Sequence, residues 1–317
     1  MAKTNKADIL KLCKDIEKKE GVGSVFQLGS DKANLNMTRW KTGIEDFDHI
    51  MGGGAPEGRI IEIFGPESSG KTSLGYHLMA LHDLALYIPI EGTFDAKNAA
   101  SFGNRPKQMI VYRARYGEQA MNKMIKFAQA GIPIIVLDSV PACKPKEDID
   151  KVMKNSNKGN DAQQDQERMG GVARLFHKYL PVLEEIIETT GTTIILINQV
   201  RDKMGAMMFG EKTDTPGGRA IKFYSSLRIQ VARRSWIEIP NKDPRNSAAN
   251  EKIGLIQKMK VVKSKVCNPM GECEVPMIFN KGYQSYDKML ETRKQMMLEN
   301  NKKSGRKVRA DMEEDDE

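Results

Sequence analysis

The chain has few cysteines and no long hydrophobic run. Its four cysteines, Cys13, Cys143, Cys267 and Cys273, form no CxxC pair, which excludes a small disulfide-built module and favours a reduced, cytoplasmic setting. The N-terminus is polar and rich in lysine, without the apolar core of a signal peptide, and no apolar run approaches the ~20 residues that a membrane-spanning helix needs. We therefore expect a soluble intracellular protein with no membrane partner.

The size of the chain permits an enzyme, and its charge favours polyanionic partners. Its 317 residues can bury the core of one large domain with additions, or of two domains. Its 50 basic residues outnumber its 42 acidic ones and give a net charge of +8, which favours a polyanion as a partner but also fits a chain that is merely soluble and basic.

The N-terminal segment predicts a helix over residues 7–20. Ile9, Leu12, Cys13 and Ile16 follow helical spacing and form one apolar stripe. A glycine-rich polar stretch over 21–39 separates this helix from the rest. The stripe therefore packs either on its own domain or on a neighbouring subunit, and the pattern does not choose between them.

From Arg59 onward, runs rich in isoleucine and valine alternate with helical segments, which is typical of βαβ units around a mostly parallel sheet. Strands are expected at 60–64, 84–90, 109–112, 132–137, 193–198, 227–231 and 259–262. A helix is expected over 171–190, and Pro181 should kink or break it, because an interior proline costs roughly 3 kcal/mol. The expected fold class is α/β.

The residues 65–72, GPESSGKT, match the phosphate-binding pattern G-x-x-x-x-G-K-[ST] between a strand and a helix. Gly65 and Gly70 let the backbone turn its N–H groups inward, Lys71 reaches the β- and γ-phosphates, and the Thr72 hydroxyl can ligate Mg²⁺. The cofactor is expected to be a nucleoside triphosphate with Mg²⁺. The cofactor-binding residues are Gly65, Pro66, Glu67, Ser68, Ser69, Gly70, Lys71, Thr72 and Ser73.

Three polar residues follow or end expected strands. Asp138, Glu91 and Gln199 should meet at the carboxyl edge of the sheet, where open α/β sheets bind their ligands. Asp138 is expected to support the metal, Glu91 to act as general base, and Gln199 to hydrogen-bond the γ-phosphate. On the residues alone, Glu91 could instead cap the following turn.

Two segments fit neither helix nor strand periodicity. The stretch 198–223 mixes cations with methionine and phenylalanine, which suits phosphates and exposed bases, and loops this long are usually functional or disordered. A mobile nucleic-acid loop and a partly disordered surface insertion both fit. The segment 154–168 is polar throughout and is either a second mobile loop or a plain linker.

The roles of a lysine pair and of the charged C-terminus are not decided by the residues alone. Lys263 and Lys265 lie two apart on an expected strand and share a face, so they either only solubilise an edge or neutralise a nucleotide's charge, and the residues favour the former. The C-terminus carries a basic run and then an acidic one, both expected to be disordered. The acidic block either shields the basic one or is inert.

Taken together and in their order along the chain, the phosphate-binding motif and the other segments described above resemble the RecA family of DNA recombinases. The resemblance is greatest to the bacterial branch and covers roughly residues 5–285. The resemblance is carried by VGSVFQLG at 22–29, GRIIEIFGPESSGKT at 58–72, GEQA at 117–120, IVLDSV at 135–140, MG at 169–170, NQVR at 198–201, MFG at 208–210, GG at 217–218, KFY at 222–224 and VVKSK at 261–265. It implies a RecA-like P-loop NTPase core at 36–286, an N-terminal oligomerisation helix within 1–35, and a short helix with a disordered tail at 287–317.

The resemblance implies an ATP-dependent recombinase that forms filaments on single-stranded DNA and exchanges strands with duplex DNA, in repair and in an SOS response. ATP would lie between protomers, with Lys263 and Lys265 reaching the neighbour's nucleotide and Gln199 acting as the γ-phosphate switch. Asp95 would contact adenine, and Phe279 is a further cofactor-binding residue. DNA loops would span about 154–169 and 200–216. The implied DNA-binding residues are Met169, Gly170, Arg174, Arg201, Lys203, Met204, Gly217 and Gly218.

Several positions depart from the family pattern. Asn98 stands where an adenine-stacking tyrosine is usual, Pro181 replaces a basic DNA contact, and the second loop has an extra residue near Ala206. The family's folded C-terminal domain is missing after about Tyr286, which suggests a phage-encoded or specialised recombinase, acting in the host cytoplasm or nucleoid if it is phage-encoded. Single-strand-binding and mediator proteins are expected partners. A ring-forming DNA translocase and a non-exchanging mediator remain the alternatives.

Overall fold

The computed structural model describes residues 5–21, 25, 37–92, 94–156, 170–202, 213–240 and 250–303. The chain divides into two units, Met1–Thr38 and Arg39–Glu317. The first contains helix α1 (Lys6–Glu20), which begins where the Asn5 side chain accepts a hydrogen bond from the Ala7 N–H. No residue of α1 is buried; of its apolar stripe, Ile9 and Leu12 are exposed, and Cys13 and Ile16 are half-buried.

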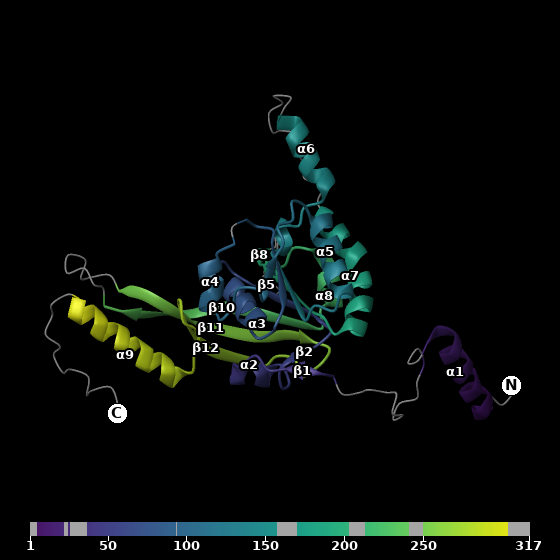
Figure 1. The fold of residues 1–317 in the computed structure, drawn as a ribbon, viewed down its shortest axis with the longest axis horizontal. Coiled ribbons are helices and arrows are strands. Elements are labelled where there is room, and N and C mark those ends of the chain that lie inside the picture. Colours follow the sequence, from purple (N-terminus) through teal and green to yellow (C-terminus); the bar gives the residue numbers. More distant parts are fainter. Residues whose placement is uncertain are drawn as a thin grey trace. The chain divides into compact units, whose positions relative to one another are not determined.

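Within the described residues, a nine-stranded sheet organises the second unit (Figure 1). Its order is β13-β12-β11-β10-β3-β7-β6-β4-β5. The pairings from β10 through to β5 are parallel, and those from β13 to β10 are antiparallel. The expectation of a mostly parallel α/β sheet is therefore confirmed. The strands are β3 (Ile60–Gly65), β4 (Ala85–Pro89), β5 (Met109–Val111), β6 (Ile134–Asp138), β7 (Thr193–Gln199), β10 (Leu227–Ile239), β11 (Glu251–Ser264), β12 (Glu272–Ile278) and β13 (Gly282–Tyr283).

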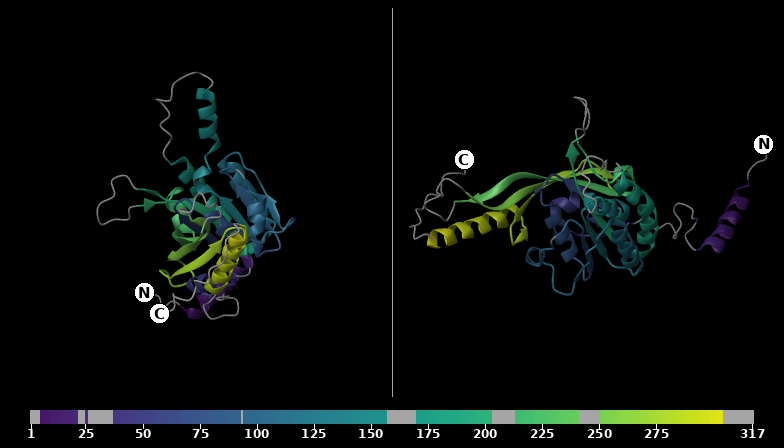
Figure 2. Two further views of the ribbon diagram at one scale, coloured as in Figure 1. Left: turned by 90° about the vertical axis from the view of Figure 1, so that its left-hand side faces the viewer. Right: turned by 90° about the horizontal axis from the view of Figure 1, so that it is seen from above.

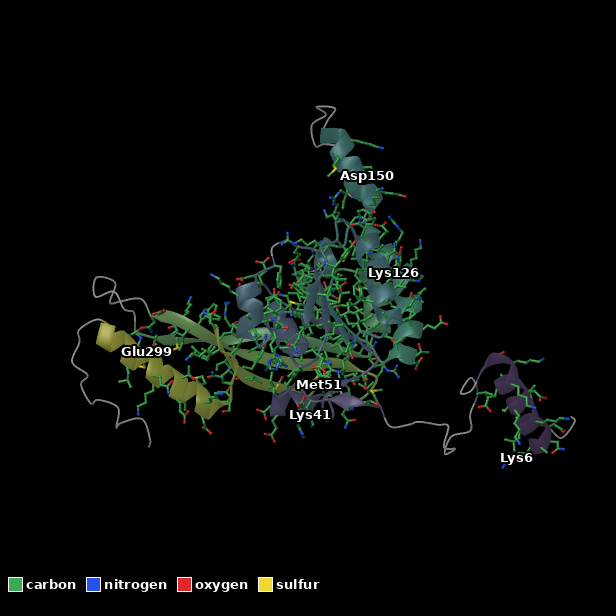
Figure 3. The ribbon with its side chains drawn as sticks, viewed as in Figure 1. Lys6, Lys41, Met51, Lys126, Asp150 and Glu299 are labelled. Atoms are coloured by element: carbon green, nitrogen blue, oxygen red, sulfur yellow. The ribbon has the colours of Figure 1, made fainter. Side chains whose placement is uncertain are left out.

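Helices cover both faces of the parallel part of the sheet. Helices α2 (Glu45–Ile50), α3 (Lys71–Ala80) and α4 (Ala96–Ser101) share one apolar cluster with alternate strand residues such as Ile134 and Val136. Helices α5 (Gly117–Gln129), α7 (Gly171–Thr190) and α8 (Gly218–Tyr224) share another with Ile135 and Leu137. Because successive side chains of a strand point to opposite faces, a strand buried on both faces is apolar throughout. Figure 3 shows these side chains filling the space around the sheet, with buried Met51 labelled.

Of the kink or break expected at Pro181, the break is wrong. Helix α7 continues from Gly171 to Thr190 with Pro181 inside it. Proline lacks the N–H that would bond the preceding turn, at a cost of roughly 3 kcal/mol. Leu180, Leu183 and Ile187 are buried around it, and burying each such side chain contributes about 1.5–3 kcal/mol. Packing on the sheet therefore outweighs the lost hydrogen bond.

Strands β10 and β11 extend well beyond the segments expected for them. Pairing between β10 and β3 ends at Gln230, and beyond that point β10 pairs with β11 alone (Figure 2). Helix α9 (Tyr286–Lys303) packs along this extension, burying Met289 against Ile237, Ile239, Ile253 and Ile278.

The remaining described elements are short. They are the paired strands β1 (Arg39–Trp40) and β2 (Ala55–Pro56), the 3₁₀ turn η1 (Val140–Ala142), helix α6 (Lys146–Ser156), and the paired strands β8 (Arg201–Asp202) and β9 (Thr213–Asp214). Among the helices as far as they are described, none is both long and apolar enough to span a bilayer.

Candidate nucleotide and nucleic-acid site

The phosphate-loop motif connects β3 to α3. Gly70, which precedes the first residue of α3, has a φ of 85°, a left-handed conformation that glycine adopts without steric cost. The Lys71 Nζ donates to the carbonyls of Gly65 at 3.0 Å and Pro66 at 2.6 Å. Burial lowers the pKa of Lys71, and the carboxylates of Asp138, Glu91 and Glu67 partly offset that effect. The lysine is thus held over its own loop.

The two expected metal residues are in contact. Thr72 Oγ1 donates to Asp138 Oδ2 at 2.8 Å, and the Tyr87 hydroxyl donates to the same oxygen at 3.0 Å. Burial raises the pKa of Asp138, whereas these two hydrogen bonds lower it. Among the described residues there is no cluster of three or more His, Cys, Asp or Glu side chains that could hold a metal. One hydroxyl and one carboxylate fit Mg²⁺, which takes few protein ligands together with phosphate oxygens and water.

Glu91 and Gln199 are in contact at the same sheet edge. Gln199 Nε2 donates to Glu91 Oε1 at 2.8 Å, and the Ser139 hydroxyl donates to that same oxygen. The expected base therefore touches the expected γ-phosphate sensor in this structure. Sequence reasoning did not identify Ser139, although its place directly after Asp138 at a strand end was an available signal.

A buried polar network holds both ends of the second loop. Asn198 Nδ2 donates to Glu62 Oε1 at 2.8 Å and to the Pro216 carbonyl at 2.9 Å. The Arg228 guanidinium pairs with the other Glu62 oxygen and donates to Thr215 Oγ1 at 3.3 Å. Glu62 has no exposed surface, and such a charge is tolerable only when it is paired and hydrogen-bonded.

This network was missed by sequence reasoning. The one available signal was a charged residue, Glu62, inside the apolar run of β3. Next to the network, β8 pairs with β9, so that Arg201 lies opposite Asp214. Arg201–Asp202 and Thr213–Asp214 are therefore held beside each other, and Arg201 follows β7 after one intervening residue.

A shallow, open hollow lies between α7 and α8 and is lined by Ala173, Arg174, His177, Arg219 and Ala220. The helices approach closely here, since a Cβ on Gly218 would lie 2.7 Å from the Ala173 Cβ. Gly170 and Gly217 directly precede the two helices. Two guanidinium groups beside one hollow suit a phosphate backbone. Arg174 was expected from the sequence, whereas His177 and Arg219 were not.

Lys263 and Lys265 make contacts within their own chain, to α8 and α7. Lys263 Nζ donates to the carbonyl oxygens of Lys222 and Phe223, near the end of α8, and to that of Ser225. The distances to the Phe223 and Ser225 oxygens are both 3.0 Å. Burial lowers the pKa of Lys263. Lys265 Nζ lies 3.8 Å from Glu184 Oε1 and 5.3 Å from the centre of the Phe223 ring.

The two remaining expected cofactor-binding residues, Asp95 and Phe279, contact other residues of the chain. Asp95 begins α4, where its carboxylate accepts the N–H groups of Lys97 at 2.9 Å and Asn98 at 3.1 Å. Phe279 follows β12 and is 38% exposed, with its ring 6.4 Å from that of Trp236. Met169, Lys203 and Met204 lie outside the described residues, as does most of the first expected loop.

Comparison with known proteins finds one family along most of the chain. A model of the RecA N-terminal domain matches residues 7–284. The protein RecA of Ruminococcus albus is 37% identical over 283 residues, covering 87% of this chain and 66% of that protein. The protein RecA of Macrococcus caseolyticus is 37% identical over 275 residues, covering 85% of this chain and 72% of that protein. The protein RecA of Lactococcus lactis is 37% identical over 290 residues, covering 90% of this chain and 70% of that protein. The chain thus spans about two thirds of these relatives or slightly more.

We expect Asp138→Asn to stabilise the nucleotide-free protein at pH 7. In the folded protein the pKa of Asp138 lies above its ordinary value of 3.8. At a pH above this raised pKa, the buried charge therefore lowers the free energy of unfolding. The penalty vanishes once the pH falls below 3.8, where the carboxyl is protonated in both the folded and the unfolded chain. Urea unfolding should show a higher midpoint for Asp138→Asn at pH 7 and a smaller gain at pH 4. The control is Asp83→Asn, at an exposed position, and a lower or equal midpoint for Asp138→Asn at pH 7 would contradict the expectation.

Proposed function

The chain belongs to the RecA family of ATP-dependent DNA recombinases, and we propose that it assembles on single-stranded DNA, pairs that strand with a homologous duplex and exchanges the strands. The observation that carries this proposal is the hydrogen bond between Gln199 and Glu91. It joins the start of the second loop to the residue proposed to activate water. Family membership supports nucleotide binding, DNA binding and self-association, and the proposal adds how they are connected.

ATP and Mg²⁺ are the proposed cofactors. The phosphate loop at 65–72 with Ser73 would hold the phosphates through its N–H groups, and Lys71 would leave the carbonyls of Gly65 and Pro66 to donate to phosphate oxygens. Thr72 and Asp138 would hold Mg²⁺, which supplies charge neutralisation at the β- and γ-phosphates. A phosphate beside Lys71 would also offset the burial that lowers its pKa.

Glu91 is the proposed base, and Gln199 the proposed sensor. Hydrogen bonds donated to the Glu91 carboxylate stabilise its charged form and so make it a weaker base toward water. Gln199 and Ser139 both donate to its Oε1. A γ-phosphate would offer the Gln199 amide a second acceptor, and transfer of the amide to it would release Glu91 and shift the residue from which the second loop begins.

The proposed DNA path follows α7, α8 and the two loops. Arg174 and Arg219 would contact the backbone from the hollow between the helices, joined by Arg201, Lys203 and Gly217-Gly218. Met169 and Met204 would contact the bases, since apolar groups inserted between bases can unstack them. Much of this affinity would be electrostatic and would fall with added salt.

Assembly would complete the site. Lys263 and Lys265 are proposed to exchange their contacts with α8 and Glu184 for the nucleotide of a neighbouring protomer, and the apolar stripe of α1 to pack on that neighbour. The proposed units are the N-terminal 1–35, the core 36–286 and the tail 287–317. The proposed setting is the cytoplasm, with single-strand-binding and mediator proteins as further partners. Neither the ring translocase nor the non-exchanging mediator is favoured.

Glu91→Gln should retain ATP and single-stranded DNA binding while slowing DNA-stimulated ATP hydrolysis by about 100-fold or more, because general-base catalysis contributes roughly 10²–10⁴-fold. Phosphate release and filter binding measure the two properties. Glu188→Gln, a surface position paired with Arg59, is the matched control. Hydrolysis by Glu91→Gln at the rate of the wild type would remove Glu91 as the base.

Homology dependence tests the proposed function itself. With ATP, the chain should join a labelled single strand to a supercoiled duplex of the same sequence and not to a heterologous duplex, since only a recombinase needs base complementarity. Gel separation of the joint molecules measures this. ATP hydrolysis without joint molecules would indicate a translocase or mediator instead.

A further inference from the structure

The shape of the phosphate loop depends on where its carbonyl groups find donors. A loop that turns its N–H groups toward an anion must turn carbonyls away from it, and buried carbonyls need partners there. Lys71 serves the carbonyls of Gly65 and Pro66, and the Ser69 hydroxyl also serves Pro66 at 2.8 Å. The Ser69 carbonyl is bonded from outside the loop, by Gln257 of β11.

Gln257 is fully buried beneath this turn. Its Nε2 donates to the Ser69 carbonyl at 2.6 Å, and its Oε1 accepts from the Tyr283 hydroxyl at 2.6 Å. The two bonds fix the orientation of the amide, because the reverse orientation would set two oxygens against each other. The amide therefore connects the phosphate loop to β13, although β10 separates β11 from β3 in the sheet.

The same amide also packs against Gly70. A Cβ added at Gly70 would lie 2.7 Å from Gln257 Nε2, so the side chain occupies the space directly under the left-handed residue that precedes α3. Gln257 thus touches both residues, Ser69 and Gly70, that set the direction in which the first N–H groups of α3 point. A glutamine that only satisfied a core hydrogen bond would not need to contact this turn.

Tyr283 holds the amide from the other side. Its ring lies 5.0 Å from that of His77 on α3 and 6.2 Å from that of Phe102. Burial raises the pKa of the Tyr283 hydroxyl, so it remains a donor at physiological pH. Tyr283 also directly precedes the segment that leads into α9, which begins at Tyr286.

We propose that Gln257 is a positioning residue for nucleotide binding, which holds the Ser69-Gly70 turn in the phosphate-binding shape, and that Tyr283 holds Gln257 in place. This inference rests on the proposed function, in which the loop at 65–72 binds ATP. It gives residues on the antiparallel strands β11 and β13 a role in the ATP site, although they lie outside the phosphate-loop motif.

The test is titration of the full chain with a fluorescent ATP analogue and Mg²⁺, beside urea unfolding. Gln257→Met keeps the length of the side chain but removes both hydrogen bonds, and should weaken nucleotide affinity about fivefold, the order expected for one net hydrogen bond. The control is Thr193→Val, which removes a buried side-chain donor to the Pro56 carbonyl at the amino end of β7. It should lower stability without changing nucleotide affinity.

Tyr283→Phe should weaken nucleotide affinity in the same direction, by about twofold, and it decides the matter if Gln257→Met does not fold. The inference is overturned if folded Gln257→Met keeps its nucleotide affinity, or if Thr193→Val loses as much affinity as Gln257→Met. If Gln257→Met does not fold, unchanged affinity in Tyr283→Phe overturns it. None of these outcomes contradicts the proposed function. A wild-type chain that does not bind the analogue would overturn the proposed function and this inference with it.

Discussion

The hydrogen bond from Gln199 to Glu91 is the interaction on which the proposed connection between nucleotide and DNA loop depends. It exists because parallel strands end together: Gly65 is in register with Gln199, and Asp138 with both Pro89 and Ile197. The residues that follow therefore converge on one edge. A nucleotide phosphate would offer the Gln199 amide a further acceptor beside Glu91. In the proposed function, a shift of this amide from Glu91 toward the phosphate connects the state of the nucleotide to the loop that begins at Val200.

The buried Glu62 gives that loop a fixed base. Its two oxygens are bonded by Asn198 and Arg228, which in turn bond Pro216 and Thr215. Both ends of the loop are thereby tied to β3, the strand that leads into the phosphate loop. In the proposed function, a movement at Gln199 would act on the loop through this network, because packed and hydrogen-bonded interiors transmit displacements instead of absorbing them.

The sequence predicts the parts of this site that depend on local pattern. The phosphate loop, Asp138, Glu91 and Gln199 follow from a motif and from strand ends. It does not predict Gln257 or Glu62, since each has its role only through strands distant in sequence. Nor does it predict the full length of β10, where Arg233 and Arg234 interrupt the apolar alternation but pairing with β11 continues. Pro181 shows tertiary packing outweighing a local signal in α7. For Lys263, the sequence does not show the α8 carbonyls that it bonds within its own chain.

The most direct test of the proposed connection is the affinity for single-stranded DNA with a non-hydrolysable ATP analogue and with ADP, measured by fluorescence anisotropy at one salt concentration. We expect the wild type to bind DNA at least about fivefold more tightly with the ATP analogue, in the range typical of coupled sites. Gln199→Ala should bind both nucleotides and lose that difference. A Gln199→Ala variant that keeps the full difference would contradict the role given to the Gln199–Glu91 hydrogen bond.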